Sequence, residues 1–372
     1  MNFRTLPLRR NRPARAVVAA AAASVLTLGL AACSGDDSGE SGTSASQTGT
    51  TGAAGGTETG DASDDQGTWP RSVDSVVVSN GKATKETEKV EIPAKPEKIV
   101  STAVTLTGSL LAVDAPVVAS GGANVGPTSD DKGFFTQWAG EADDRGVKAL
   151  WQLEPDLQKV AAEDPDLILV SASGADTATA QYEELKKIGV PVVVLDYSDK
   201  TWGDITTSIG EITGHEAEAA DAIQSYDDRV REVTEKIEKP EQPVNVVIPA
   251  QEGAVNFFTA ESAQGEIVKD LGWDLDVPGD GVARTDGSYA GRTDVRQVTA
   301  ENADKGLVGK TVLGINVDGK EPVIDKLKAV PNLAGTYAVS NDRVFELAPS
   351  AFRIDYFSAM DILDQIEDYF AK

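Results

Sequence analysis

Residues able to perform covalent or metal chemistry are scarce in this 372-residue chain. Cys33 is its single cysteine and His215 its single histidine, so no intramolecular disulfide and no cluster of cysteine and histidine ligands can form. His215 stands in a Gly-His-Glu junction at the expected start of a helix, where a solvated side chain is the interpretation we favour. No Gly-x-Ser-x-Gly elbow occurs that would activate a serine nucleophile. We therefore expect a protein that is not an enzyme.

Charge restricts the partners further. The chain has 34 lysines and arginines against 60 aspartates and glutamates, which gives a formal net charge of -26. Such a surface repels nucleic acid, so we expect no nucleic-acid partner. It also repels an anionic ligand at long range. Any site for an anion must therefore be built locally from arginine side chains.

The amino terminus has the features of an export signal. A basic region with five arginines precedes an uncharged apolar run from Ala16 to Ala32, which is too short for a comfortable membrane span. The run ends in Leu30-Ala31-Ala32-Cys33, and small residues before a lone cysteine resemble a lipobox. This resemblance implies cleavage before Cys33 and a lipid anchor on its sulfur. The expected location is outside the cell membrane, with attachment to its outer face through this lipid only.

A segment without core-forming residues follows the signal peptide, which we assign to residues 1–32. Ser34 to Thr68 contains no lysine, arginine, valine, isoleucine, leucine or aromatic residue. Such a composition cannot form a packed core. We predict a disordered acidic tether over residues 33–68.

The most regular pattern of the chain runs from Glu216 to Glu238. Apolar residues recur there at spacings of three and four, which indicates one stripe along an α-helix: Ala219, Ala220, Ile223, Tyr226, Val230, Val233 and Ile237. Gly214 precedes this helix, and Pro240 and Pro243 follow it. It should be roughly 35 Å long. It fits a rigid connector between two lobes, or an ordinary surface helix within one domain.

Short apolar strands alternate with helices on both sides of this helix, which indicates parallel sheets covered on both faces. We predict an α/β fold with an amino-terminal lobe (69–201), connector helices (202–239) and a carboxyl-terminal lobe (240–372). The first lobe opens with a hairpin around Asn80-Gly81. Each lobe is a parallel-sheet α/β unit, one long helix joins them, and a ligand cleft lies between them. The expected strands cover residues 96–100, 116–119, 167–170, 190–195, 244–248, 311–315 and 343–347, and a closing amphipathic helix covers 355–371.

The order of signal, tether, lobe, long helix and lobe resembles the substrate-binding lipoproteins of ABC importers for iron-siderophores and cobalamin. Local stretches are more similar to one branch, the ferric enterobactin-binding proteins. The most specific is Thr105 to Ala112 (TLTGSLLA) followed by Asp114 to Ser120 (DAPVVAS). The other stretches are Gly133 to Ala149, Pro165 to Asp176, Asp199 to Gly214, Glu261 to Gly272 and Phe352 to Ala359.

The resemblance implies a monomer that binds a ferric siderophore in its cleft and delivers it to an ABC permease and its ATPase. It implies no cofactor, and no metal ligand from the protein, because the siderophore already saturates iron with its own oxygens. An anionic ferric catecholate calls for arginines and for aromatic faces.

Candidate ligand-binding residues follow from the resemblance. Arg292 and Arg353 fall where it places ligand-facing residues, although each could instead form an ion pair with Asp294 or Asp355. Further candidates are Trp202, Trp151 on an expected loop and Tyr289, with Arg296 and Arg284 as weaker ones. Phe134, Phe135 and Trp138 are expected to form a helical aromatic patch that belongs more to the core than to the cleft.

Two positions depart from the family pattern. The loop from Gly121 to Lys132 lacks the arginine that the family usually carries, and Lys132 cannot supply a bidentate fork, which leaves room for a related or linear catecholate. For permease docking, Glu301 matches in the second lobe, whereas Gln158 occupies the position in the first lobe. Glu154, Asp156 or Glu163 could replace it.

Other functions remain compatible with these residues. A protein of this class could bind another iron chelate, cobalamin or haem. From a different class, a siderophore esterase could occupy the same cleft.

Overall fold

The computed structural model describes residues 67–152, 155–198 and 200–372, all of which belong to one compact unit of the chain. The predicted signal peptide, Cys33 and the tether up to residue 66 lie outside the described residues, as does Glu154. Within the described ranges, no helix is long and apolar enough to cross a membrane.

A fully parallel sheet forms the first lobe, in the order β5-β4-β3-β6-β7. Its strands are β3 (Ile99–Ser101), β4 (Val117–Gly122), β5 (Lys148–Gln152), β6 (Leu167–Ser171) and β7 (Val192–Leu195). Helices α1 (Val104–Ala112), α2 (Ala139–Asp144), α3 (Leu157–Ala162) and α4 (Tyr182–Lys186) connect them. Strands β3, β6 and β7 are buried along their whole length, so the sheet forms the centre of this lobe.

The predicted hairpin precedes this sheet. Strands β1 (Arg71–Ser79) and β2 (Lys82–Ile92) pair antiparallel around Asn80-Gly81, whose φ angles of 51° and 72° suit a tight hairpin turn. The hairpin lies beside β7, where the Val194 amide donates to Ser75 Oγ at 2.9 Å.

The second lobe has a mixed sheet, in the order β10-β9-β8-β11-β12. Strands β8 (Val244–Pro249), β11 (Thr311–Ile315) and β12 (Val344–Leu347) are parallel, as predicted. Strand β9 (Val255–Phe258) runs antiparallel to both β8 and β10 (Val295–Val298). These two short strands were not predicted, because four residues with polar members give no clear pattern. The helices of this lobe are α7 (Ala263–Asp270), α8 (Ala303–Gly306), α9 (Val323–Lys328), α10 (Tyr337–Ser340) and α11 (Tyr356–Phe370).

Short 3-10 turns complete the connections in both lobes. They are η1 (Thr179–Gln181), η2 (Gln251–Gly253), η3 (Gly287–Tyr289), η4 (Ala300–Asn302) and η5 (Pro349–Phe352).

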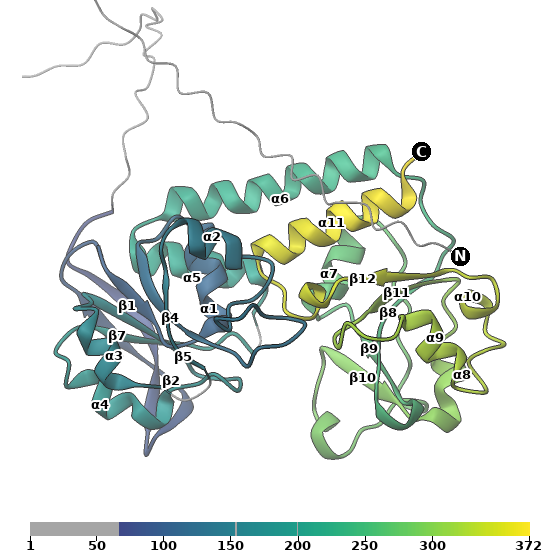
Figure 1. Cartoon of the computed structure of the whole chain (residues 1–372), viewed down its shortest axis with the longest axis horizontal. Coiled ribbons are helices and arrows are strands. Elements are labelled where there is room, and N and C mark those ends of the chain that lie inside the picture. Colours follow the sequence, from purple (N-terminus) through teal and green to yellow (C-terminus); the bar gives the residue numbers. More distant parts are fainter. Residues whose placement is uncertain (1–66, 153–154, 199) are drawn as a thin grey trace, which may run out of the picture. The chain divides into compact units, whose positions relative to one another are not determined.

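The long predicted helix exists as α6 (Glu216–Lys236) and follows α5 (Trp202–Thr213), which ends at Gly214 in the left-handed conformation. Its end falls two residues before the predicted Glu238, because Ile237 leaves the helix and pairs with Ala371. Most of the predicted stripe is buried, but Ile223 is half-buried, Ala220 is exposed, and Ala222 is buried in place of Ala220. Figure 1 shows α6 running past both sheets, with α11 beside its second half.

Helix α6 is held on both sides, as a connector requires. It crosses α5 at Gly210, where a Cβ atom would approach Ala219 Cβ to 2.7 Å. Towards the second lobe, Arg229 of α6 pairs with two residues of α11, at 2.7 Å to Asp364 Oδ1 and 2.6 Å to Glu367 Oε2. The helix therefore joins elements of both lobes through packing and ion pairs.

Candidate ligand-binding site

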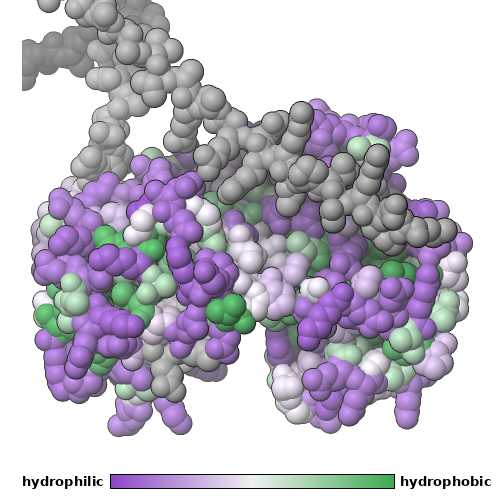
Figure 2. All heavy atoms as spheres, viewed as in Figure 1, coloured by the Kyte–Doolittle hydropathy of each residue, from purple (hydrophilic) through white to green (hydrophobic). Residues whose placement is uncertain are grey.

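A pocket of about 610 Å³ is lined by residues of both lobes. The first lobe contributes the segments that follow β3, β6 and β7, among them Thr105, Ser173 and Tyr197. Ligands of parallel α/β sheets bind beyond the carboxyl ends of the strands, so this placement agrees with the predicted cleft. Figure 2 shows the surface hollowed between the two halves, with mostly hydrophilic side chains on the visible face.

Helices α1, α5, α7 and α11 all begin at this pocket. A helix amino terminus carries a partial positive charge, so these helices favour an anion there. Side chains already cap them: Asp176 accepts from the Thr105 amide at 3.0 Å, and Ser262 Oγ accepts from the Gly265 amide at 2.9 Å. The helix dipoles would therefore stabilise an anionic ligand, but the ligand would form its hydrogen bonds mainly with side chains.

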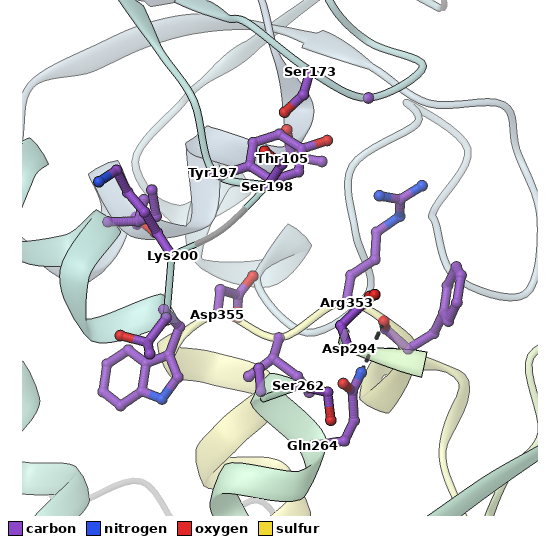
Figure 3. Close-up of a pocket in the computed structure, with 18 of the residues that line it drawn as sticks. Thr105, Ser173, Tyr197, Ser198, Lys200, Ser262, Gln264, Asp294, Arg353 and Asp355 are labelled. Atoms are coloured by element: carbon purple, nitrogen blue, oxygen red, sulfur yellow. Dashed lines mark hydrogen bonds between the residues drawn. The ribbon is translucent and has the colours of Figure 1, made fainter. Parts of the chain in front are cut away.

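Arg353 is exposed at the pocket and follows η5. Its guanidinium carbon lies 5.4 Å from the centre of the Phe135 ring and 5.5 Å from that of Phe352. The alternative ion pair with Asp355 does not form, and no carboxylate of the described residues pairs with Arg353. Figure 3 shows its side chain between Tyr197 of the first lobe and Gln264 of the second. Among the described residues, Arg353 is thus a cation without a carboxylate partner, close to two aromatic rings.

Arg292 also lines the pocket but is paired. Its Nε lies 2.9 Å from Asp294 Oδ1 and its Nη2 lies 2.5 Å from Asp294 Oδ2, which is the alternative foreseen from the sequence. The Arg292 guanidinium, through these bonds, holds the pKa of Asp294 below its ordinary range.

Trp202 forms part of the pocket wall at the start of α5. Its ring is 5.0 Å from that of Tyr226 on α6 and 6.2 Å from that of Tyr356 on α11. Because Trp202 is only 7% exposed, a ligand can reach little more than its edge. The residue therefore serves both the pocket and the junction between the lobes.

The remaining candidates lie outside this pocket lining. Trp151 is in strand β5, not in the expected loop, because Lys148–Gln152 pairs with β4, and its indole covers Gly121. Arg296 of β10 pairs with Asp280 at 2.6 Å. The hydroxyl of Tyr289 donates to Asn256 Oδ1 at 3.1 Å. Arg284 pairs with Asp286 at 3.0 Å.

Some pocket residues were missed by the sequence analysis. Ser173 follows β6, and Tyr197 and Lys200 follow β7, so attention to the ends of the predicted strands could have found them. Burial raises the pKa of Tyr197, which keeps its hydroxyl protonated. Phe135 was expected in a helical core patch, yet it precedes α2, is buried, and still lines the pocket.

Asp355 connects the lobes at the pocket floor. It caps α11, where Oδ1 accepts from the Ser358 amide at 3.0 Å, and its Oδ2 accepts from Gln137 Nε2 of the first lobe at 3.1 Å. Burial raises the pKa of this carboxyl to about 6, although its hydrogen bonds oppose the rise.

Residues predicted for other roles are also located. His215 is buried, not solvated, because α5 and α6 meet there, and its Nδ1 lies 3.0 Å from Thr213 Oγ1. Lys132, a substitute for the missing arginine, pairs with Asp143 instead of lining the pocket. Glu301 is exposed in η4, and Gln158 is exposed in α3.

The sequence matches the periplasmic binding protein family over residues 99–351, and the chain belongs to that family. It is therefore one of the exported proteins that bind ligands for uptake. The ferric enterobactin-binding periplasmic protein FepB of Escherichia coli O6:H1 is 40% identical over 304 residues, which cover 81% of this chain and 91% of that protein. The petrobactin-binding protein YclQ of Bacillus subtilis is 33% identical over 119 residues, 31% of this chain and 35% of that one.

Solved structures agree with this assignment. Holo-ViuP has a TM-score of 0.68 and 32% identity, and the match covers 82% of this chain and 97% of that structure. The FhuD protein from S. pseudintermedius has a TM-score of 0.59 at 20% identity, with 80% and 98% coverage, and supports the fold alone.

Proposed function

We propose that this protein captures a ferric catecholate siderophore of the enterobactin type and delivers it to the permease of an ABC importer for iron uptake. The observation that carries this proposal is Arg353, which has no carboxylate partner in the part of the chain that the structure describes and lies close to Phe135 and Phe352 in the pocket of a strongly acidic chain. A guanidinium can donate charge-assisted hydrogen bonds to catecholate oxygens, while the exposed ring of Phe352 can stack on a catechol ring. The 40% identity to FepB supports the same ligand class.

Other groups of the pocket suit the rest of such a ligand. Lys200 adds a second cation. The hydroxyls of Thr105, Ser173 and Ser262 donate their protons within the protein, so each can accept from the amide N–H groups that link catechols. Iron enters as cargo, held by the oxygens of the siderophore. The chain's task is therefore recognition of charge and shape, with no covalent step.

The predicted anchor and docking residues complete this proposal. A lipid on Cys33 holds the monomeric protein at the outer face of the cell membrane. Glu301, which is exposed in the second lobe, meets the permease together with an acidic residue of the first lobe such as Glu154.

A titration with a panel of ligands tests the function. Ferric enterobactin, a ferric bis-catecholate, ferrichrome, ferric citrate, cobalamin and haem are each added to the full chain while tryptophan fluorescence is followed. We expect ferric catecholates to quench it at sub-micromolar concentrations, because Trp202 lines the pocket. Tight binding of another ligand of the panel, without binding of any catecholate, would show the assignment to be wrong.

A further inference from the structure

The ion pair between Arg292 and Asp294 is open to a ligand. Both residues line the pocket, and their side chains are 47% and 41% exposed. The pair therefore presents a carboxylate, and not only a cation, to whatever occupies the site.

Two hydrogen bonds from Thr259 hold the backbone around this pair, and neither involves the side chain of Arg292 or Asp294. The Thr259 amide donates to the Asp294 carbonyl at 3.0 Å, and Thr259 Oγ1 donates to the Thr293 carbonyl at 2.6 Å. These bonds hold the segment against the end of β9, close to the start of α7. A change of the Asp294 side chain leaves both bonds in place.

The cations of the pocket differ in whether a carboxylate pairs with them. Neither Lys200 nor Arg353 forms an ion pair with the described residues, whereas Asp294 compensates Arg292. The Coulomb energy between a fixed carboxylate and a ligand is proportional to the charge of the ligand. Asp294 therefore opposes a trianion more strongly than a monoanion.

We propose that Asp294 is a specificity determinant. It reduces the margin in binding affinity by which the protein prefers trianionic ferric tris-catecholates to monoanionic ferric bis-catecholates. This inference rests on the proposed function. It assigns to the acidic partner of Arg292 a role in selecting the charge of the siderophore, with Arg353 as the cation common to both ligand classes.

The same pair also orients Arg292, so charge and orientation must be separated. Asp294 accepts from Nε and from one N–H of Nη2, which leaves Nη1 and the second N–H of Nη2 to donate to a ligand. Asparagine keeps an oxygen that can accept from Arg292 but has no charge, so Asp294→Asn removes the charge and retains part of the orientation. Asp294→Ala removes both.

A matched control exists in the same lobe. Asp286 pairs with Arg284, two residues before it, with the same spacing as Asp294 and Arg292, and neither residue lines the pocket. Asp286→Asn removes one negative charge from the protein without changing the pocket. Any change of ligand affinity in this variant therefore measures the effect of the protein's net charge alone.

The experiment measures dissociation constants of ferric enterobactin and of a ferric bis-catecholate for the full chain and its variants by fluorescence titration. Thermal unfolding confirms that each variant is folded. For Asp294→Asn we expect ferric enterobactin to bind about tenfold more tightly and the bis-catecholate only about twofold more tightly, because the logarithm of the gain follows ligand charge. Both gains should shrink as salt rises, while Asp286→Asn changes neither affinity appreciably.

Several results would overturn the inference. Equal gains for both ligands, or no gain with Asp294→Asn, would exclude selection by charge. A loss for both ligands in Asp294→Asn and a larger loss in Asp294→Ala would assign Asp294 to orientation of Arg292 only. A wild-type protein that binds neither catecholate would instead contradict the proposed function itself.

Discussion

Replacement of Asp355 by asparagine tests whether a buried carboxyl at the junction of the lobes makes folding depend on pH. The residue is 6% exposed, and burial raises the pKa of its carboxyl from 3.8 to about 6. Between these two values the native protein retains a proton that the unfolded chain has released. The contribution of Asp355 to the free energy of unfolding is therefore greatest below about pH 4 and falls as pH rises through 6.

The difference between the two pKa values corresponds to about 3 kcal/mol. Asparagine cannot ionise and caps a helix about as well as aspartate. We expect Asp355→Asn to match the wild type near pH 4 and to exceed its free energy of unfolding by up to about 3 kcal/mol above pH 7. Urea denaturation of both proteins from about pH 4 to 8 measures this difference, in which the contributions of other carboxyls cancel.

Asp355→Ala supplies the control. Alanine also lacks a titrating group but loses the cap of α11, so its curve should run parallel to that of Asp355→Asn and about 1 kcal/mol lower. A difference between Asp355→Asn and the wild type that stays constant with pH would refute the reasoning.

Further changes test the site, the anchor and the docking surface. Arg353→Ala and Arg292→Ala should each weaken ferric-catecholate binding by more than about 1.5 kcal/mol in a fluorescence titration, and unchanged affinity in both would contradict the site. Cys33→Ala should move the protein from the membrane to the soluble fraction on cell fractionation, and persistent membrane association would argue against the anchor. Glu301→Ala should slow iron uptake by cells while the affinity of the purified protein stays the same; normal uptake would exclude this residue from docking. Structures with and without ligand should differ by a lobe rotation below about 20°, and a much wider closure would contradict a connecting helix.

Features set by neighbours in the sequence were predictable. The stripe of α6, the Asn80-Gly81 turn and the cap of α7 at Ser262 depend on residues within a few positions of one another. The pairing of Arg292 with Asp294 could be foreseen for the same reason, since a single residue separates them along the chain.

Features set by distant residues were not predictable. Trp151 lies in a strand because β5 pairs with β4, and no local pattern identifies that pairing. The burial of Asp355 depends on the close approach of α1: a Cβ atom on Gly108 would lie 2.5 Å from Asp355 Oδ2 and 2.8 Å from Trp138 Cδ1. Without this glycine the carboxyl would not reach the first lobe. Nothing in the sequence near Asp355 indicates that the carboxyl is buried.

The attachment of α6 to both α5 and α11 has a calorimetric consequence. A protein whose lobes close widely buries surface of its own when it binds, and burial of apolar surface lowers the heat capacity. Here Gly210 and Arg229 fix the helix against both lobes before any ligand arrives. The heat-capacity change of binding should therefore be small, and should report the area that the ligand itself covers.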